Sequence, residues 1–434
     1  MTASFSQHNH TEKGQLKKVI ASCMIGNALE WFDFALFGYF STTFAVIFFP
    51  KTSLVASLMA TFGVFAAGFI MRPLGGIIFG HIGDKLGRRK SLMLSIYLMA
   101  IPTTLIGLLP TYEQIGWLAP FLLTLIRLIQ GLSMGGEFTG SMVFVVENSP
   151  HEHRGFYGSW VVFSLLIGIL VGGLISTSIC YVLSEEQVLS WGWRIPFLLS
   201  VVGGFVGSIM RRTIHEPEEY TEAKKHYKKE STPLVELFQK HLKTIVYVIM
   251  IELTLSIGFF MITMFIPNFL ATHLRFNMVT SLMMTSISMT AMGVAIMISG
   301  WLSDRMEREN ILMASSLAFA FFSYPLFVAL EGSFTSALIA QIIFSFMMGF
   351  FFAPMPAVLV DLFPVNVRYS GISISHSLSM AFFGGTVPFI AASLIHLTNN
   401  TAAPAIYLSI ASLVAFSALY FAKERQSLRP ASSN

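Results

Sequence analysis

Twelve apolar segments, most of them twenty residues or longer, follow one another along almost the whole 434-residue chain. A helix of about 20 residues, rising 1.5 Å per residue, crosses a hydrocarbon core about 30 Å thick. Only 12% of the residues are charged, whereas a soluble protein has about 25%. The sequence therefore predicts an all-α membrane protein with twelve transmembrane helices. The expected spans cover about 19–48, 54–79, 91–110, 117–146, 156–182, 193–211, 244–271, 279–302, 311–330, 334–360, 371–396 and 403–422.

The basic residues are distributed unequally between the two sides of this map. Of the 27 Lys and Arg residues, Lys51, Arg194 and Arg275 fall on one side, and Arg72 and Arg127 fall inside helices. All the others, Arg211 included, fall in tails and loops of the opposite side, which the positive-inside rule places in the cytoplasm. We therefore expect a multi-pass protein of the inner (plasma) membrane with both termini cytoplasmic. The basic pI then reflects topology, and no nucleic-acid partner is expected.

One long hydrophilic stretch divides the chain. It covers residues 212–243 and carries mixed charges around EPEEYTEAKKHYKKE. We interpret it as a solvated cytoplasmic linker with one or two short surface helices, and Pro233 suits the first turn of such a helix. The expected organisation is a tail (1–18), a six-helix half (19–211), the linker, a second six-helix half (244–422) and a tail (423–434).

Two loops of the first half reappear in the second half. GHIGDKLGRRK (80–90) resembles GWLSDRMER (300–308), and the loops after the fourth and tenth spans agree as well. These matches predict two parallel repeats, as in transporters that rock around a site at the membrane midplane. The matching residues are Gly80, Asp84 and Arg88 with Gly300, Asp304 and Arg308, at an offset of 220, and Glu147 and Arg154 with Asp361 and Arg368, at 214.

These loop residues are predicted to gate one face of the protein. The glycines allow close approach of backbones, and an aspartate is stabilised at a helix N-terminus. The arginines are expected to pair with Glu147 or Asp361 when this face is closed, and to separate when it opens. Loops that serve only to set topology would explain the basic charges, but not the fixed Gly and Asp spacing.

Six charged residues are expected at membrane depth, where each costs at least about 2.5–3.5 kcal/mol and marks a candidate functional site. Five of them lie in the first half: Glu30, Asp33, Arg72, Arg127 and Glu137; the sixth is Glu252. Proton and substrate chemistry is therefore expected mainly in the first half.

The acids are the candidate proton-coupling residues. Glu30 and Asp33 are three residues apart and share a helix face, so that one of them is expected to hold a proton near neutral pH. Alternatively, each neutralises Arg72 or Arg127 as a buried pair. Glu137 follows two glycines and is either a third proton carrier or a member of a buried ion pair.

The candidate substrate-binding residues are the two buried arginines with nearby polar and aromatic side chains. Arginine binds a carboxylate through two parallel hydrogen bonds, so Arg72 or Arg127 is a natural partner for a carboxylate substrate. Gln130 lies about one turn beyond Arg127. Trp31 and Tyr39 are aromatic residues of the first helix, and a quaternary ammonium group is recognised by aromatic faces.

Several longer motifs resemble a known family. The segment 80–90 resembles the signature of the major facilitator superfamily, and RLIQGLSMGG (127–136) resembles its companion motif. GNALEWFDFALFGYF (26–40), GLSMGGEFTG (131–140) and WGWRIPF (191–197) resemble the metabolite:proton symporter branch. Members of this branch move proline and betaine, α-ketoglutarate, citrate or shikimate. The resemblance implies the major facilitator fold, and the stretch 112–160 is most similar to the proline/betaine members.

The expected function is therefore proton-coupled uptake of a small carboxylate-bearing metabolite by alternating access. A proline- or betaine-like zwitterion is the first expectation, and a di- or tricarboxylate is the second. A transport-inactive nutrient receptor is an alternative from another class. The sequence shows no nucleophile, metal cluster or phosphate loop of an enzyme, so neither catalysis nor a cofactor is expected. The expected partners are the substrate, protons and the bilayer, with the monomer as the functional unit.

Overall fold

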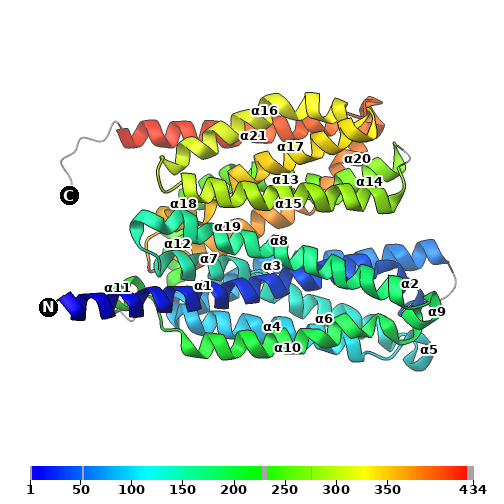
Figure 1. Ribbon diagram of the computed structural model, residues 1–434, viewed down its shortest axis with the longest axis horizontal. Coiled ribbons are helices and arrows are strands. Elements are labelled where there is room, and N and C mark those ends of the chain that lie inside the picture. The colour runs from blue at the N-terminus through cyan, green and yellow to red at the C-terminus, as the bar shows by residue number, and fades with distance from the viewer. Residues whose placement is uncertain (1, 51–52, 227–231, 275, 428–434) are drawn as a thin grey trace. The chain divides into compact units, whose positions relative to one another are not determined.

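The computed structural model describes residues 2–50, 53–226, 232–274 and 276–427. Lys51, Arg275, part of the predicted linker (227–231) and the end of the C-terminal tail (428–434) lie outside these residues. All regular elements of the described chain are helices (Figure 1), and twelve of them are long and apolar enough to cross a membrane. The predicted fold class is confirmed.

The spans are formed by the following helices, some of which are interrupted. They are α1 (Thr2–Tyr39), α3 (Leu54–Lys85), α4 (Arg88–Leu108), α6 (Leu118–Met134) with α7 (Glu137–Glu147), α8 (Arg154–Val182), α10 (Arg194–Thr213), α13 (Leu242–Phe260) with α14 (Ile266–Thr272), α15 (Met278–Leu302), α16 (Arg308–Leu330), α17 (Phe334–Phe352) with α18 (Met355–Leu362), α19 (Arg368–Ser379) with α20 (Val387–Thr398), and α21 (Ala403–Ser427). The shorter α-helices are α2 (Ser41–Ile47), α5 (Tyr112–Ile115), α9 (Glu185–Gln187), α11 (Glu218–His226) and α12 (Pro233–Lys240).

Two differences from the expected boundaries bear on the site, in addition to the extension of α1 back to Thr2 and of α21 to Ser427. The first span, predicted over 19–48, ends at Tyr39, and α2 begins after Phe40. The segment 80–90, predicted as a loop, is mostly helical, because α3 continues to Lys85 and α4 begins at Arg88. The turn between them needs only Leu86 and Gly87, and Gly87 has a φ of 123°, which L-residues with a side chain rarely adopt.

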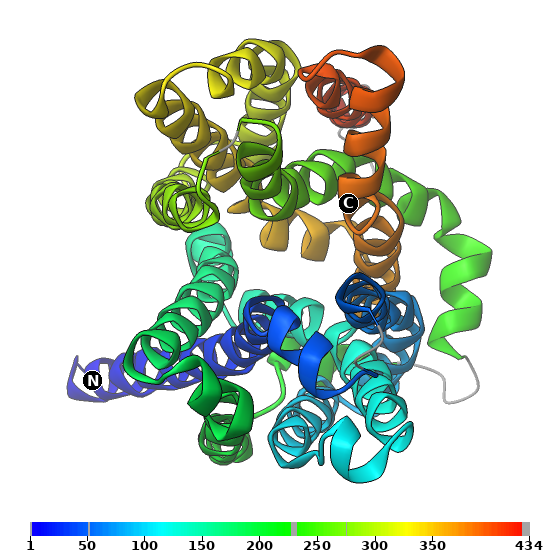
Figure 2. The ribbon, with the colours of Figure 1, turned by 90° about the vertical axis from the view of Figure 1, so that its right-hand side faces the viewer.

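The chain divides into two compact units, whose helices are seen nearly end-on in Figure 2. Unit 1 consists of Met1–Ser149, Ser164–Gln239 and Phe363–Ser377. Unit 2 consists of Pro150–Phe163, Lys240–Leu362 and Leu378–Asn434. Each unit therefore contains one short segment from the other half of the sequence. The boundaries expected at 211/212 and 243/244 remain a prediction.

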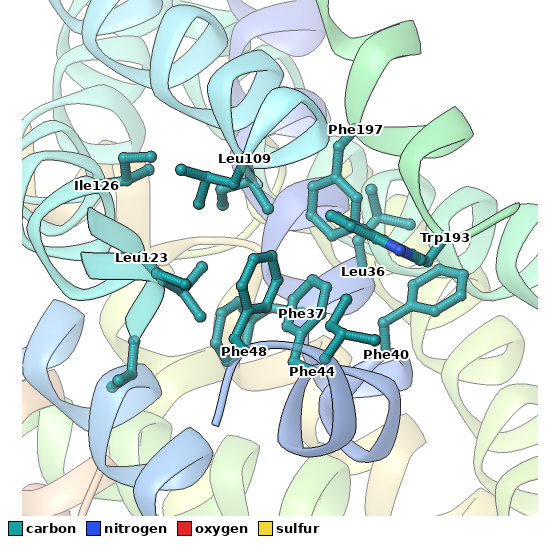
Figure 3. Packing of buried hydrophobic residues seen from close by; sticks show 14 of the residues in the cluster. Leu36, Phe37, Phe40, Phe44, Phe48, Leu109, Leu123, Ile126, Trp193 and Phe197 are labelled. Carbon is teal, nitrogen blue, oxygen red and sulfur yellow. The ribbon is translucent and has the colours of Figure 1, made fainter. Parts of the chain in front are cut away.

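A cluster of buried aromatic side chains lies in unit 1 near the end of α1 (Figure 3). The ring of Phe44 on α2 meets Trp193 edge-to-face at 5.6 Å between centroids, and Phe48 meets the same indole at 5.4 Å. Edge-to-face pairs of this kind stabilise by about 0.5–1.5 kcal/mol beyond area burial. The cluster thereby holds α2 against the start of α10.

Elsewhere in unit 1, α3 and α6 cross at a point where no side chain can be inserted. A Cβ atom on Gly75 would overlap the Leu132 carbonyl, and one on Gly131 would overlap the Gly68 carbonyl. Small residues at helix crossings allow this backbone approach, as is common between membrane helices.

The linker contains two short helices, as predicted, and Pro233 is the first residue of α12. It is not fully solvated, however, because Tyr220 on α11 and Leu237 on α12 are buried. Tyr220 lies against the body of unit 1, where its hydroxyl donates to the Asp84 carbonyl.

Candidate functional site

A buried ion pair connects α1 and α6. Arg127 Nη1 donates to Asp33 Oδ2 at 2.6 Å, and Gln130 Nε2 donates to Asp33 Oδ1 at 2.8 Å. Gln130 also donates to the Thr103 hydroxyl at 2.8 Å, and its Oε1 accepts from Arg127 Nη1. The four side chains are buried. The Arg127 guanidinium lies 4.3 Å from the ring centroid of Phe37. Because every member is held by another, the network fixes the carboxylate and the guanidinium in one geometry.

Glu30 lies one turn earlier on the same helix and has different neighbours. Its carboxylate is fully buried, and no side chain of the described residues hydrogen-bonds it. The favourable groups that face it are the charge of Arg72 and the Phe138 backbone N–H, whereas Asp33 and Glu137 repel it. Arg72 is also fully buried, with its guanidinium 5.6 Å from the ring centroid of Phe69. Glu30 is therefore held more loosely than Asp33.

Glu137 forms a second buried ion pair, whose partner the sequence did not reveal. Both its oxygens accept from Arg211 of α10, and Ser95 and Ser141 donate to them as well. Arg211, predicted in a loop on the basic side, is completely buried. That assignment was wrong because α10 extends to Thr213.

A local signal for this position does exist in the sequence. Gly204, Gly207 and Ser208 precede Arg211 at helical spacing, and all four residues lie on the buried face of α10. Glu137, the partner of Arg211, lies in the first turn of α7, because the fourth span is interrupted at Gly135 and Gly136.

The remaining candidates are Trp31, Tyr39 and Glu252. Trp31 is buried on α1, and its ring is 5.3 Å from that of Phe34. Tyr39, at the end of α1, is 38% exposed and faces Gly173 of α8. Glu252 is buried in α13 of unit 2. Among the residues described, no group of three or more His, Cys, Asp and Glu side chains is arranged to hold a metal ion.

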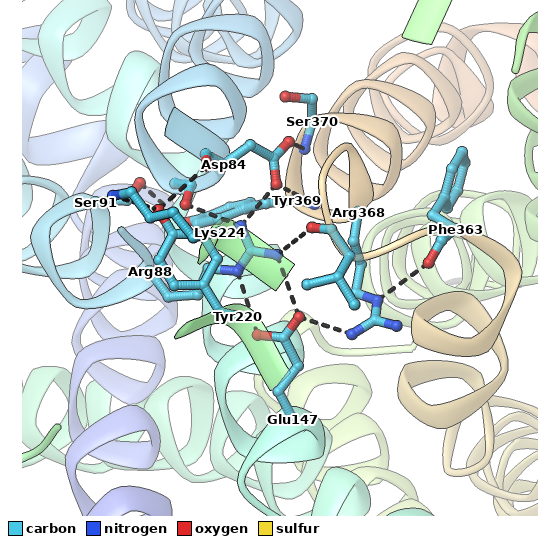
Figure 4. Close-up of polar contacts among 12 residues, drawn as sticks. Asp84, Arg88, Ser91, Glu147, Tyr220, Lys224, Phe363, Arg368, Tyr369 and Ser370 are labelled. Carbon is cyan, nitrogen blue, oxygen red and sulfur yellow. Dashed lines mark hydrogen bonds and ion pairs between the residues drawn. The ribbon is translucent and has the colours of Figure 1, made fainter. Parts of the chain in front are cut away.

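The predicted gating residues of unit 1 form one group, which we call the Asp84 cluster: Asp84, Arg88, Glu147 and Arg368 (Figure 4). Arg88 donates to Asp84 at 2.7 Å and, through Nε and Nη2, to both oxygens of Glu147 at 3.2 Å. Arg368 donates to Glu147 at 2.8 Å. Asp84 also accepts the backbone N–H groups of Tyr369 and Ser370, at 3.1 and 2.8 Å. An acid from α3 thus caps the first turn of α19.

The predicted gating residues of unit 2 form the Asp304 cluster: Asp304, Arg308, Asp361 and Arg154. Arg308 and Arg154 donate to the two oxygens of Asp361, at 2.8 and 3.3 Å. Asp304 accepts the backbone N–H groups of Gly155 and Phe156, at 2.8 and 3.1 Å. Burial raises the pKa of the Asp304 carboxyl, while these two N–H groups act in the opposite direction.

The two clusters correspond residue by residue, at the two offsets found in the sequence. Asp84 caps the helix that begins at Arg368, and Asp304 caps the helix that begins at Arg154. Gly80 lies where α3 meets this cap, since a Cβ on it would be 2.6 Å from the Ser370 Cα. The Asp–N-terminus contact expected from the sequence is therefore present twice.

Twelve helical spans, buried ion pairs in the first half and a repeated ion cluster are the features of a polytopic membrane transporter. The model of the Major Facilitator Superfamily matches residues 23–289 and 254–434. The chain belongs to this superfamily.

Relatives of similar length carry transporter names. The chain is 32% identical over 426 residues to the glycine betaine/proline/ectoine/pipecolic acid transporter OusA of Dickeya dadantii, which covers 95% of this chain and 84% of OusA. It is 32% identical over 416 residues to the proline/betaine transporter of Salmonella typhimurium, covering 93% and 82% of the two chains.

Solved structures of the same fold include two proton symporters. The proton:xylose symporter XylE, bound to 6-bromo-6-deoxy-D-glucose, has a TM-score of 0.77 at 16% identity and covers 95% of this chain and 96% of its own. The transporter FucP in its outward conformation has a TM-score of 0.68 at 16% identity, with 94% and 98% covered. At this identity the likeness shows the fold alone.

Proposed function

We propose that the protein is a proton-coupled symporter that imports a small zwitterion resembling proline or glycine betaine. The relatives named above support the substrate class. The observation that carries the chemistry is the buried network of Asp33, Arg127 and Gln130, because it places a carboxylate and a carboxylate-binding cation on facing helices.

In this proposal Arg127 binds the substrate carboxylate. Its Nη1 is bonded to Asp33, whereas its Nε has no partner among the described residues and remains available as a donor. When a proton neutralises Asp33, the attraction between the two side chains weakens, and a substrate carboxylate can replace Asp33 on the guanidinium. Arg72 serves as the second cation of the same unit.

The proton is carried by the three acids of unit 1. Glu30 faces Asp33 and Glu137, so that protonating one of them relieves repulsion on the others. Glu30 is the first acceptor in this scheme, because no side chain holds its carboxylate. Glu137 is the third acid of the scheme and is held by Arg211 and two serines.

The ammonium end of the substrate is assigned to aromatic faces of α1. Trp31 and Tyr39 are the proposed contacts, because a quaternary ammonium is attracted by a ring face at about 0.5–2 kcal/mol. The two acid–arginine clusters close the cytoplasmic face in one state and separate in the other. Alternating access then exposes the site to either side of the inner membrane, with both termini cytoplasmic and the monomer as the working unit.

A second candidate substrate is a di- or tricarboxylate such as α-ketoglutarate or citrate. The observation that favours it is the presence of two buried arginines, Arg72 and Arg127, in one unit. A substrate with two acidic groups would occupy both.

The test is uptake of labelled substrate by proteoliposomes with an imposed inward proton gradient. Proline, glycine betaine, α-ketoglutarate and citrate are compared, each with and without an uncoupler. The proposal predicts uncoupler-sensitive accumulation of proline or betaine, lost in Asp33→Asn and Arg127→Ala but kept in the exposed controls Glu222→Gln and Lys243→Ala. Normal accumulation by both site variants would refute the site, and binding of proline without transport would favour a receptor.

A further inference from the structure

The two clusters share the aspartate cap and the two arginines on one acid, but their acid–arginine pairs differ in exposure to solvent. In the Asp84 cluster the side chains of Arg88 and Glu147 are 0% exposed and that of Arg368 is 9% exposed. In the Asp304 cluster the Arg308–Asp361 pair is exposed, at 18% and 46%, whereas Asp304 and Arg154 are 4% and 5% exposed. The repeat therefore explains the shared contacts, but not why the Arg88–Glu147 pair is buried while the equivalent Arg308–Asp361 pair is exposed to solvent.

The linker helix α11 accounts for this difference, because it covers the Asp84 cluster. The ring centroid of Tyr220 lies 4.5 Å from the Arg88 guanidinium carbon, and its hydroxyl donates to the Asp84 carbonyl at 3.2 Å (Figure 4). One residue earlier, Glu219 accepts from Arg368 at 3.0 Å. The helix thus touches three of the four cluster residues, and it adds a third acid to the two that the arginines already bind.

Two further contacts hold the linker in place on unit 1. Before α11, Glu216 accepts the backbone N–H of Arg89 at 3.1 Å, so it caps the start of α4. Gly87 makes this approach possible, since a Cβ there would overlap Glu216. After α11, Glu236 of α12 accepts from Asn366 at 3.0 Å. Both linker helices therefore bind the short segment 363–377, and α11 also binds the Asp84 cluster.

We propose that α11 is a detachable cover of the Asp84 cluster, and that Glu219 and Tyr220 are positioning residues for gating. The inference builds on the gating role in the proposed function. An ion pair kept out of water separates only with a large loss of interaction, whereas a solvated pair contributes little. Undocking α11 lets water reach Arg88 and Glu147, and so makes the separation of this cluster fast. The Arg308–Asp361 pair of the Asp304 cluster needs no such step, because it is already exposed to solvent.

The linker is thereby a part of the gate and more than a tether. When α11 is docked, it slows the opening of the cytoplasmic face. When α11 is undocked, the Asp84 cluster opens with kinetics like those of the solvent-exposed Arg308–Asp361 pair. Any change that weakens α11 docking is expected to change the rate of turnover and to leave substrate affinity in place.

Hydrogen exchange of the amides in the first turns of α19 and α8 tests the proposal. The α8 amides serve as an internal reference, because, among the described residues, α11 does not cover the Asp304 cluster. The amides of Tyr369 and Ser370 report on the Asp84 cluster, and those of Gly155 and Phe156 report on the Asp304 cluster. Glu219→Gln and Tyr220→Ala are expected to accelerate exchange at the first two amides by about tenfold or more, as for loss of contacts to charged groups. The second two amides should not change.

Two further variants keep the test decisive. Tyr220→Phe retains the ring over Arg88 and loses only the hydroxyl bond, so exchange at the capped amides should accelerate less than in Tyr220→Ala. Glu222→Gln makes the same chemical change as Glu219→Gln on an exposed position of the same helix, and should match the wild type. If Tyr220→Ala does not fold, Glu219→Gln and Tyr220→Phe carry the comparison.

Transport separates this inference from the proposed function. In proteoliposomes, Glu219→Gln should change Vmax by at least about twofold and leave KM for the transported substrate within about twofold. Unchanged exchange at Tyr369 and Ser370 in both Glu219→Gln and Tyr220→Ala would overturn the cover, whatever the substrate is. Faster exchange in a protein that transports neither proline nor betaine would support the cover and refute the substrate.

Discussion

Replacing Asp33 by asparagine leaves the Arg127 guanidinium buried without its counter-charge. The side chains of the pair are 1% and 2% exposed, and Nη1 and Oδ2 are 2.6 Å apart. Removing one partner of such a pair typically destabilises by about 3–5 kcal/mol, because the other charge stays buried and uncompensated. Gln130 remains hydrogen-bonded to an amide oxygen at position 33, so the loss is expected near the lower end, about 3 kcal/mol.

The double variant Asp33→Asn/Arg127→Met tests the reason for this loss. Methionine has a similar reach and no charge, and replacing a whole buried pair by neutral groups is often nearly neutral. We therefore expect the double variant to recover about 2 kcal/mol or more relative to Asp33→Asn, measured by reversible unfolding in mixed micelles at fixed lipid-to-detergent ratio. Equal unfolding free energies for the single and double variants would show that the uncompensated charge of Arg127 is not the cause of the loss.

Three other predictions concern unit 1. Gly75→Ala should destabilise the protein by about 1–3 kcal/mol, because the added methyl group meets the backbone of α6. Gly38→Ala, whose methyl group meets open space, should change the stability by less than about 0.5 kcal/mol. Thermal shift compares the two variants. Arg211→Ala should destabilise by about 3–5 kcal/mol through loss of its buried pair, and Arg212→Ala, on the exposed side, by less than about 1 kcal/mol in the same assay. Burial raises the pKa of the Glu216 carboxyl above 4.5, so the folded state binds this proton more tightly than the unfolded state. The free energy of unfolding should therefore fall as the pH rises from 4.5 through the raised pKa. Glu216→Gln should flatten this pH dependence.

The membrane spans were predictable from sequence because each one needs an apolar run of fixed length, and the twelve observed spans agree with those expected to within a few residues in most cases. The acid–arginine clusters were predictable because the repeat makes the same spacing appear twice. Arg211 was not, because hydropathy counts a charged residue at a helix end as outside the membrane. Its burial depends on Glu137, 74 residues away.

The linker was misjudged for a related reason. Its charges indicate solvation when they are read along the chain, yet Glu216, Glu219 and Tyr220 lie close enough on one face to meet basic groups of unit 1. Charge composition alone does not distinguish a solvated helix from one docked on complementary charges. Only the contact with Arg88, fixed by the tertiary structure, decides between the two.

The caps at Asp84 and Asp304 also have a consequence for biosynthesis. Phe156 is synthesised 148 residues before Asp304, and Asp84 is synthesised 286 residues before Ser370. At a synthesis rate of about 5–20 residues per second, Asp304 is made about 7–30 s after the start of α8 that it caps. The amides that Asp84 binds are made about 14–57 s after Asp84 itself. The first half therefore cannot cap α8 or satisfy Asp84 from its own residues, and its maturation is expected to finish only after the eleventh span has been inserted.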